Sequence, residues 1–266
     1  MIGFDADAVV ARLTGERLRG PVMHLQETTS TNDVAARLAG EGHPEGTVVV
    51  ADCQTAGRGR RGHVWSSPPR TGLLFTALLR PHLPPAECGL LAGACGVAVA
   101  LGLGRVTGTH FATKWPNDVV HRGRKVAGIL VEGQLPDYAA VGIGVNLLGD
   151  PEAIGLPTGD RVTTVQEATG VALGREEALG ALLDELDRWY GLLLRGERSF
   201  IVDAQERLDV TVGREVTLTM GDTEVRTTVV GLSETGRLRV LLDGAAIEIS
   251  DADGHTLRLA PPEVTD

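Results

Sequence analysis

The sequence predicts an α+β fold in two parts, on the strength of three observations. Helix-like and strand-like segments are interspersed up to about residue 208. Beyond that position, short strands of alternating apolar and polar residues follow one another, separated by glycine-containing turns. The composition, with 42% apolar and 23% charged residues in a chain of 266, is that of an ordinary globular protein. We therefore expect a larger domain over 1–208 and a smaller one over 209–266.

The first part contains segments with helical periodicity and helix start signals. The expected helices are 5–19, 31–38, 84–102 and 176–194. The first and last of these are amphipathic. Ser30 or Thr31 can cap the second helix. The third begins at Pro84 and Pro85 and is almost wholly apolar, so it must be buried.

Strands are predicted from runs of β-branched and other apolar residues. In the first part they are 22–25, 47–52, 73–79, 111–114, 119–121, 125–131 and 139–146. Arg122–Gly123 should form a hairpin turn. In the second part the strands are 215–219, 224–231, 237–242 and 245–250. Gly-Asp, Thr-Gly and Asp-Gly turns separate these last strands, which suits a small β-barrel.

Charge and residue usage exclude several classes of protein. A net charge of -10 argues against a surface that binds nucleic acid or anionic membrane throughout, although a local basic site remains possible. No uninterrupted run of about 18 apolar residues is present, so we expect no transmembrane helix. The N-terminus also lacks a signal-peptide pattern. Cys53, Cys88 and Cys95 have no metal-ligand spacing, and the last two suit a helical core. These features predict a reduced, cytoplasmic protein with no metal site.

Lysine and asparagine are unusually rare in this chain. There are two lysines, Lys114 and Lys125, against 23 arginines, and three asparagines, Asn32, Asn117 and Asn146. Lysine is normally among the commonest residues. The five residues fall in three short segments, so these segments are candidates for chemistry that arginine and aspartate cannot replace.

A glycine- and arginine-rich loop is predicted between residues 54 and 69. Its segment 57–62 reads Gly-Arg-Gly-Arg-Arg-Gly, which formally matches the dinucleotide-binding pattern. No helix start follows it, so that interpretation fails, and no Walker A motif occurs in the sequence. Arg58, Arg60 and Arg61 suit carboxylate or phosphate oxygens, and Trp65 offers a flat face for a ring. A solvated loop and an RNA-contacting loop remain alternatives.

Three further segments carry polar groups suited to binding. Lys114-Trp115-Pro116-Asn117-Asp118 places a lysine at a strand end, where it can reach into a cleft. Ser30-Thr31-Asn32 alone is no more than a helix cap. In 142–146, small residues would let a ligand lie against the strand, and Asn146 could offer a donor and an acceptor to a base edge.

Together, in this order and spacing, the four segments resemble the biotin protein ligases, over roughly residues 22–260. The segment 54–62 with Trp65 and the segment 114–118 are specific to that family. The resemblance implies a mixed β-sheet flanked by helices, a class II synthetase-like core, followed by a small C-terminal SH3-like β-barrel. It implies an ATP-dependent ligase that makes biotinyl-5′-AMP and transfers biotin to a lysine of a biotin carboxyl carrier protein domain of acyl-CoA carboxylases.

The resemblance also implies roles for individual residues. The residues expected to bind biotin are Ser30, Thr31, Asn32, Gln54, Arg58, Gly59, Arg60 and Lys114. Among them Arg58, Arg60 and Lys114 are the expected catalytic residues, since they would hold the carboxylate and the α-phosphate. Trp65 and Asn146, with Lys114, are expected at the adenylate. Mg²⁺ is expected with ATP rather than at a dedicated site.

Several expectations concern partners and regulation. Some members of the family carry an N-terminal winged-helix repressor domain. Only about 20 residues precede the first core strand here, so we expect no DNA binding. The protein should be a monomer or a homodimer. Asp118 is a candidate base for the acceptor lysine, although a turn or lysine-pairing role is favoured. Because few apolar residues and no acid lie within the arginine loop, it is expected to order only when an anion binds.

Two alternative functions remain open. A lipoate or octanoate ligase or transferase shares the general fold, and a non-enzymatic RNA-binding protein could use the arginine loop with Trp65. The RNA-binding protein would be expected to carry a wider basic surface than this acidic chain offers.

Overall fold

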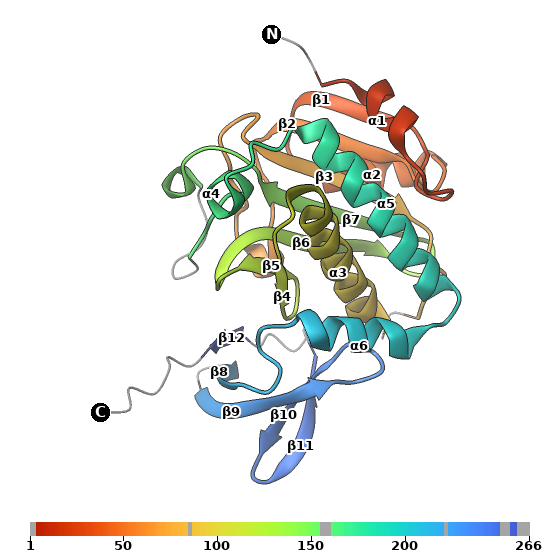
Figure 1. Ribbon diagram of the computed structural model, residues 1–266. Coiled ribbons are helices and arrows are strands. Elements are labelled where there is room, and N and C mark those ends of the chain that lie inside the picture. The colour runs from red at the N-terminus through yellow and green to blue at the C-terminus, as the bar shows by residue number, and fades with distance from the viewer. Residues whose placement is uncertain (1–3, 85–86, 155–160, 221–222, 251–255, 260–266) are drawn as a thin grey trace.

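The computed structural model describes residues 4–84, 87–154, 161–220, 223–250 and 256–259. It has a larger part built on a mixed sheet and a smaller, strand-rich part below it, with helix α6 (Arg198–Leu208) beside the junction (Figure 1). The expected mixed sheet flanked by helices, followed by a separate β-rich region, is confirmed.

The larger part is organised by a seven-stranded sheet in the order β1-β2-β3-β7-β6-β5-β4. Only β1 and β2 pair in parallel, and the other neighbours are antiparallel. The strands are β1 (Val22–Thr28), β2 (Val48–Gln54), β3 (Gly72–Leu79), β4 (Ala112–Lys114), β5 (Asp118–His121), β6 (Arg124–Gln134) and β7 (Tyr138–Asn146). Arg122 and Gly123 both have positive φ and form the expected hairpin turn between β5 and β6.

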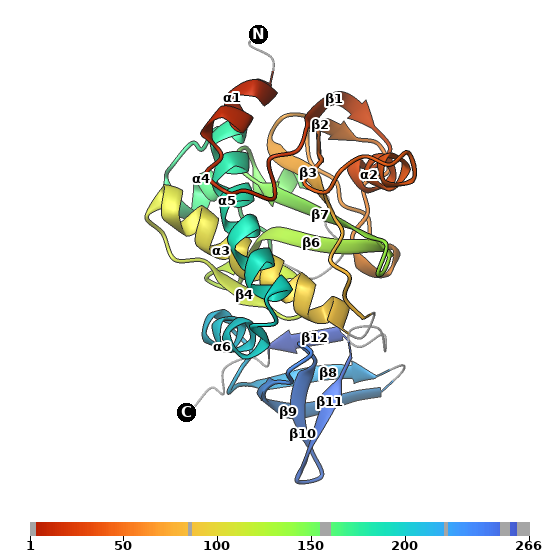
Figure 2. The same cartoon turned by 90° about the vertical axis from the view of Figure 1, so that its right-hand side faces the viewer.

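The smaller part is an antiparallel sheet in the order β11-β10-β9-β8-β12. Its strands are β8 (Glu215–Met220), β9 (Thr223–Leu232), β10 (Leu238–Leu242), β11 (Ala245–Ile249) and β12 (Thr256–Leu259). The Asp243–Gly244 turn has positive φ at both residues, as the sequence predicted. Strand β12 was not predicted; it pairs with β8 and closes the row of strands on the side nearest the larger part (Figure 2).

Helices cover both faces of the larger sheet. Helix α2 (Thr31–Gly40) packs on one face, and α1 (Ala6–Arg12), α3 (Cys88–Thr107) and α5 (Arg175–Leu194) lie on the other (Figure 2). The short α4 (Val165–Thr169) and α6 were not predicted. Two 3₁₀ turns, η1 (Arg60–Gly62) and η3 (Pro151–Ala153), complete the helical elements of the described residues.

Helix α3 is the buried apolar helix that the sequence predicted, but it begins and ends later in the sequence than expected. It extends to Thr107 rather than 102, where Gly108 ends it in the left-handed conformation. Within the described residues, Gly89–Thr107 is long and apolar enough to cross a membrane by length and composition alone, but 67% of its apolar window is buried inside the protein, as expected for a core helix. Cys95 lies in the core as expected, whereas Pro85 and the Cys88 side chain fall outside the described residues.

The prediction of a helix over 5–19 is wrong beyond Arg12, where α1 ends. The backbone turns away because carboxylates on α5 bind the N–H groups that follow. Asp187, 6% exposed, accepts hydrogen bonds from the backbone of Glu16 at 3.0 Å, Arg17 at 2.8 Å and Leu18 at 3.2 Å. A buried carboxylate with three donors stabilises an irregular segment that local sequence cannot specify.

Asp187→Asn should therefore destabilise the protein by about 2 kcal/mol, because the amide NH₂ would face backbone donors and leave N–H groups unsatisfied. Urea unfolding at neutral pH measures this change in the free energy of unfolding. Asp203→Asn is the matched control, since Asp203 is exposed on α6. Equal stability of the two variants would contradict the assigned role of Asp187.

A second buried carboxylate ties β2 to the rest of the larger part. Asp52, 5% exposed, accepts hydrogen bonds from Arg175 at 2.6 Å, His24 at 2.7 Å and Arg70 at 2.9 Å. Burial acts to raise the pKa of Asp52, but these hydrogen bonds outweigh it and lower the pKa to about 2. The charged form is therefore the one that the fold stabilises.

This lowered pKa predicts a pH dependence of stability. The contribution is fully present above the ordinary aspartate pKa of 3.8 and is lost as the pH falls through about 2. It amounts to about 2 kcal/mol. Urea unfolding between pH 7 and pH 2 should show that Asp52→Asn, although less stable at pH 7, loses less stability on acidification than the unsubstituted protein. Parallel pH profiles would refute this prediction.

Candidate functional site

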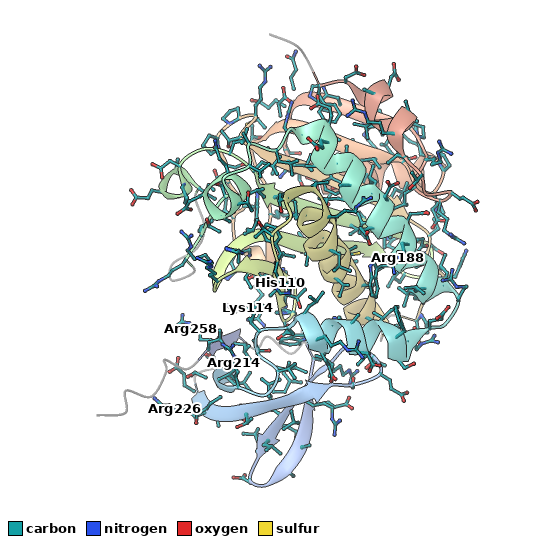
Figure 3. All side chains as sticks on the ribbon, viewed as in Figure 1. His110, Lys114, Arg188, Arg214, Arg226 and Arg258 are labelled. Carbon is teal, nitrogen blue, oxygen red and sulfur yellow. The ribbon has the colours of Figure 1, made fainter. Side chains whose placement is uncertain are left out.

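A cavity of about 330 Å³ opens at the junction between the two parts. Figure 3 shows Lys114 of the larger part and Arg258 of the smaller part on either side of this junction. The cavity collects residues from α2, the arginine loop and the central strands. Its lining includes Ser30, Thr31, Asn32, Gln54, Arg58, Arg60, Trp65, Lys114, Asn117, Asp118 and Lys125, with Leu257 and Arg258 of β12.

One end of the cavity is a buried polar network at the N-terminus of α2. Ser30 caps the helix by accepting a hydrogen bond from the Asn32 backbone at 3.3 Å. Gln54 Oε1 accepts two hydrogen bonds from Thr31, one from the backbone N–H at 2.7 Å and one from the side-chain hydroxyl at 3.0 Å. Thr76 donates to Asn32 Oδ1 at 2.6 Å. Hydroxyl and amide groups fixed in this way suit a small polar ring with both donors and acceptors.

The sheet beneath this network is lined with glycine for a steric reason. A Cβ at Gly142 would lie 2.3 Å from Asn32 Oδ1, and one at Gly144 would lie 2.5 Å from Trp65 Cε2. A Cβ at Gly128 would meet the same indole at 2.9 Å. The small residues noted on β7 therefore allow the protein's own side chains to lie against the strand. Trp65 is only 6% exposed, and its indole occupies the space that a Cβ at Gly144 or Gly128 would need.

The arginine loop contacts acids from other elements, and these contacts were not predicted from the loop's own sequence. Arg58 donates to Asp33 of α2 at 2.6 and 3.0 Å and to Glu132 of β6 at 3.1 Å. The hydrogen bond from Arg58 holds the pKa of Asp33 below its ordinary value. Together with the buried Trp65, these contacts anchor the loop at both ends.

Arg60 has a different environment from Arg58. Its half-buried side chain lines the cavity, and Nη1 lies 3.4 Å from Asn117 Oδ1. Burial, together with the charge of Arg61, lowers the pKa of Arg60 to about 10. The guanidinium is therefore charged at neutral pH although its surroundings disfavour the charge. An anion in the cavity would relieve this cost.

The segment 114–118 forms another wall. Lys114 ends β4 and lines the cavity, as its position before Pro116 predicted. Asn117 is fixed by donating to the Ile129 carbonyl at 2.8 Å. Asp118 pairs with Lys125 at 2.6 Å, and Lys125 lies 5.5 Å from the Trp65 ring centroid. This ion pair supports the lysine-pairing role of Asp118 over that of a base.

The smaller part is joined to this wall through buried hydrogen bonds. Trp115 Nε1 donates to the Gly236 carbonyl at 3.2 Å, and its backbone N–H donates to Asp209 at 2.7 Å. Burial raises the pKa of Asp209. Because Trp115 directly follows Lys114, the position of the smaller part bears directly on the position of the lysine.

The structure brings together nine of the predicted site residues: Ser30, Thr31, Asn32, Gln54, Arg58, Gly59, Arg60, Trp65 and Lys114 all line the cavity. Asn146 is not among the lining residues. It is 1% exposed, and its Nδ2 lies 3.4 Å from the Thr163 carbonyl.

Sequence reasoning missed Asp33, Thr76, Glu132, Leu257 and Arg258 as parts of the site. The acids gave no local signal because they come from elements distant in sequence from the loop they bind.

Comparisons with known proteins agree with this geometry. The model of the Biotin/lipoate A/B protein ligase family matches residues 23–146, and that of the Biotin protein ligase C terminal domain matches residues 211–252. The Biotin–[acetyl-CoA-carboxylase] ligase of Mycobacterium tuberculosis is 31% identical over 240 residues, covering 88% of each chain. The chain belongs to the biotin protein ligase family. The family's C-terminal domain agrees with the expected SH3-like region.

Further biotin protein ligases give the extent of the likeness. The Paracoccus denitrificans ligase is 41% identical over 177 residues, which is 64% of this chain and 72% of that one. The Aquifex aeolicus biotin protein ligase in complex with biotin and ATP is 32% identical, covers 90% of this chain and 99% of its own, and has a TM-score of 0.77. The chain spans 49% of the length of the Bacillus subtilis Bifunctional ligase/repressor BirA, at 36% identity.

Proposed function

We propose that this protein activates biotin with ATP to biotinyl-5′-AMP and transfers biotin to a lysine of a biotin carboxyl carrier protein domain. One observation supports this most directly. A single cavity joins a buried network of hydroxyl and amide groups to two cations, Arg60 and Lys114. The network suits the ureido ring of biotin, and the cations suit its carboxylate and the α-phosphate of ATP. Names of the biotin–[acetyl-CoA-carboxylase] ligase relatives support the same reaction.

In the first step, a carboxylate oxygen of biotin attacks the α-phosphorus of ATP, and the bond to pyrophosphate breaks. Two anions approach each other, so cations must offset their repulsion. Lys114 and Arg60 would serve this purpose. Because the pKa of Arg60 is already lowered by burial, an anionic neighbour is especially favourable there.

In the second step, the amine of the acceptor lysine attacks the acyl carbonyl, loses a proton and displaces AMP. The adenylate is already activated, so no covalent intermediate with the protein is needed. Asp118 is engaged by Lys125 and would act by holding that lysine beside Trp65.

Mg²⁺ would enter as part of the nucleotide substrate. Among the described residues, no group of three or more His, Cys, Asp or Glu side chains could hold a metal ion. We propose that the reaction takes place in the cytoplasm.

The function is tested by exchange of labelled pyrophosphate into ATP. Exchange should depend on biotin and should not be supported by lipoate or octanoate. Exchange with lipoate in place of biotin would establish the lipoate alternative, and no exchange with any of these acids would refute the proposed activation step. A purified carrier domain should then gain one biotin per acceptor lysine.

A further inference from the structure

Arg58 and Arg60 lie two residues apart in the arginine loop, yet their partners differ. The Arg58 guanidinium binds both carboxylate oxygens of Asp33 and also reaches Glu132 Oε2. These acids belong to α2 and β6, so Arg58 joins the loop to two separate elements of the fold. A guanidinium held between two carboxylates is a poor ligand for a third anion, because the local charge is already negative.

Glu132 has a second contact that reaches the polar network. The same oxygen that accepts from Arg58 also accepts from Asn32 Nδ2, at 2.7 Å. Thr76 donates to the other end of that amide, at Oδ1. The two contacts fix which end of the Asn32 amide is the donor and which the acceptor. Glu132 therefore links the orientation of a buried ring-binding residue to the position of the arginine loop.

We infer that Arg58 is a positioning residue, which holds the arginine loop against Asp33 and Glu132, and that Glu132 couples this loop to the Asn32 amide. The inference rests on the proposed function, and it changes the role implied for Arg58 by family resemblance. Anion binding in the cavity is then the task of Arg60 and Lys114. Arg58 acts by keeping Arg60 over the bound carboxylate and by keeping the loop closed over the adenylate.

The two alternative roles of Arg58, loop anchor or anion ligand, predict opposite effects of removing the carboxylates of Asp33 and Glu132. If Arg58 anchors the loop, Asp33→Asn and Glu132→Gln should each weaken biotin binding several-fold, and Arg58→Gln about tenfold, as for groups in one network. Arg58→Gln should then add little in an Asp33→Asn, Glu132→Gln background. If Arg58 is an anion ligand, removing the acids should leave biotin binding unchanged or tighten it, and Arg58→Gln should keep its full effect in that background.

The experiment measures biotin affinity by calorimetry, with trypsin cleavage after Arg58, Arg60 and Arg61 as a second readout. If Arg58 anchors the loop, trypsin should cleave the loop faster in Asp33→Asn and in Glu132→Gln. The same variants should show an increased KM for biotin and faster loss of biotinyl-adenylate, with an unchanged KM for ATP. Glu41→Gln is the matched control, because it removes the other ion pair of α2, Arg37–Glu41, whose side chains are 60% and 48% exposed. The control should change none of these quantities.

Three outcomes overturn the inference: tighter or unchanged biotin binding in the two acid variants, an additive effect of Arg58→Gln, or cleavage as slow as in the control. Arg58→Lys provides a variant that keeps the charge without the bidentate contact, and it should restore only part of the affinity. Absence of biotin-dependent exchange in the unsubstituted protein would instead refute the proposed function, since loop cleavage is measured without any reaction.

Discussion

Lys114→Gln is expected to lower the rate of biotinyl-adenylate formation by at least about 10²-fold, the usual cost of removing one strong electrostatic contact from a reacting centre. Glutamine is one atom shorter than lysine and stays polar, but the positive charge is lost where the carboxylate and the α-phosphate approach. The cavity supplies Arg60 as a second cation, yet its charge is already disfavoured by burial. The measurement is single-turnover formation of the adenylate from biotin and ATP.

The control for this variant is Arg188→Gln. Arg188 is 62% exposed on α5, and Figure 3 shows it remote from Lys114. This change also removes one positive charge, so it separates the local effect from the change in net charge. If both variants formed adenylate at the unsubstituted rate, the assignment of Lys114 to the reacting centre would be wrong.

The second large effect is expected at Gly142. An alanine Cβ there would lie 2.3 Å from Asn32 Oδ1, which is too close for any real contact. Asn32 is 4% exposed and makes hydrogen bonds to both Thr76 and Glu132, so its displacement leaves buried polar groups unpaired. Because Asn32 is proposed to bind the ring, its displacement should weaken biotin binding by roughly 10²-fold, which corresponds to about 3 kcal/mol of binding free energy. Calorimetric titration with biotin gives the affinity.

Gly180→Ala provides the comparison for Gly142→Ala. Gly180 lies within α5, and a Cβ there would meet nothing within 4 Å. The same chemical change should leave biotin affinity unaltered and raise stability by roughly 0.5–1 kcal/mol, since alanine favours the helix. Normal biotin affinity in Gly142→Ala would show that Asn32 does not bind the ring as proposed.

The sequence predicted best where a segment's own residues determine its conformation. The apolar helix α3, the Arg122–Gly123 turn and the alternating strands after residue 208 are examples. Site residues were predicted where rare residue types and a family motif coincided, as for Lys114 and Asn32. These signals are local, and so they survive without knowledge of the fold.

What the sequence could not predict depends on contacts between distant segments. The irregular segment after α1 is held by Asp184 and Asp187, about 170 residues away. The anchoring of the arginine loop depends on Asp33 and Glu132, and acids are too common in this chain to stand out. Trp65 lines the cavity, and the sequence could not predict that its indole would lie against Gly128 and Gly144 on neighbouring strands.

The pairing of β12 with β8 determines when, during synthesis of the chain, the cavity can be completed. Leu257 and Arg258 line the same cavity as Ser30, although nearly the whole chain separates them. A ribosome must therefore release the strand at 256–259 before the cavity acquires its complete wall. A nascent chain can fold the sheet and the α2 cap earlier, but it cannot enclose the site. A complete site thus forms only after β12 has been synthesised, which limits the time during which a nascent chain without this strand could release a reactive acyl-adenylate.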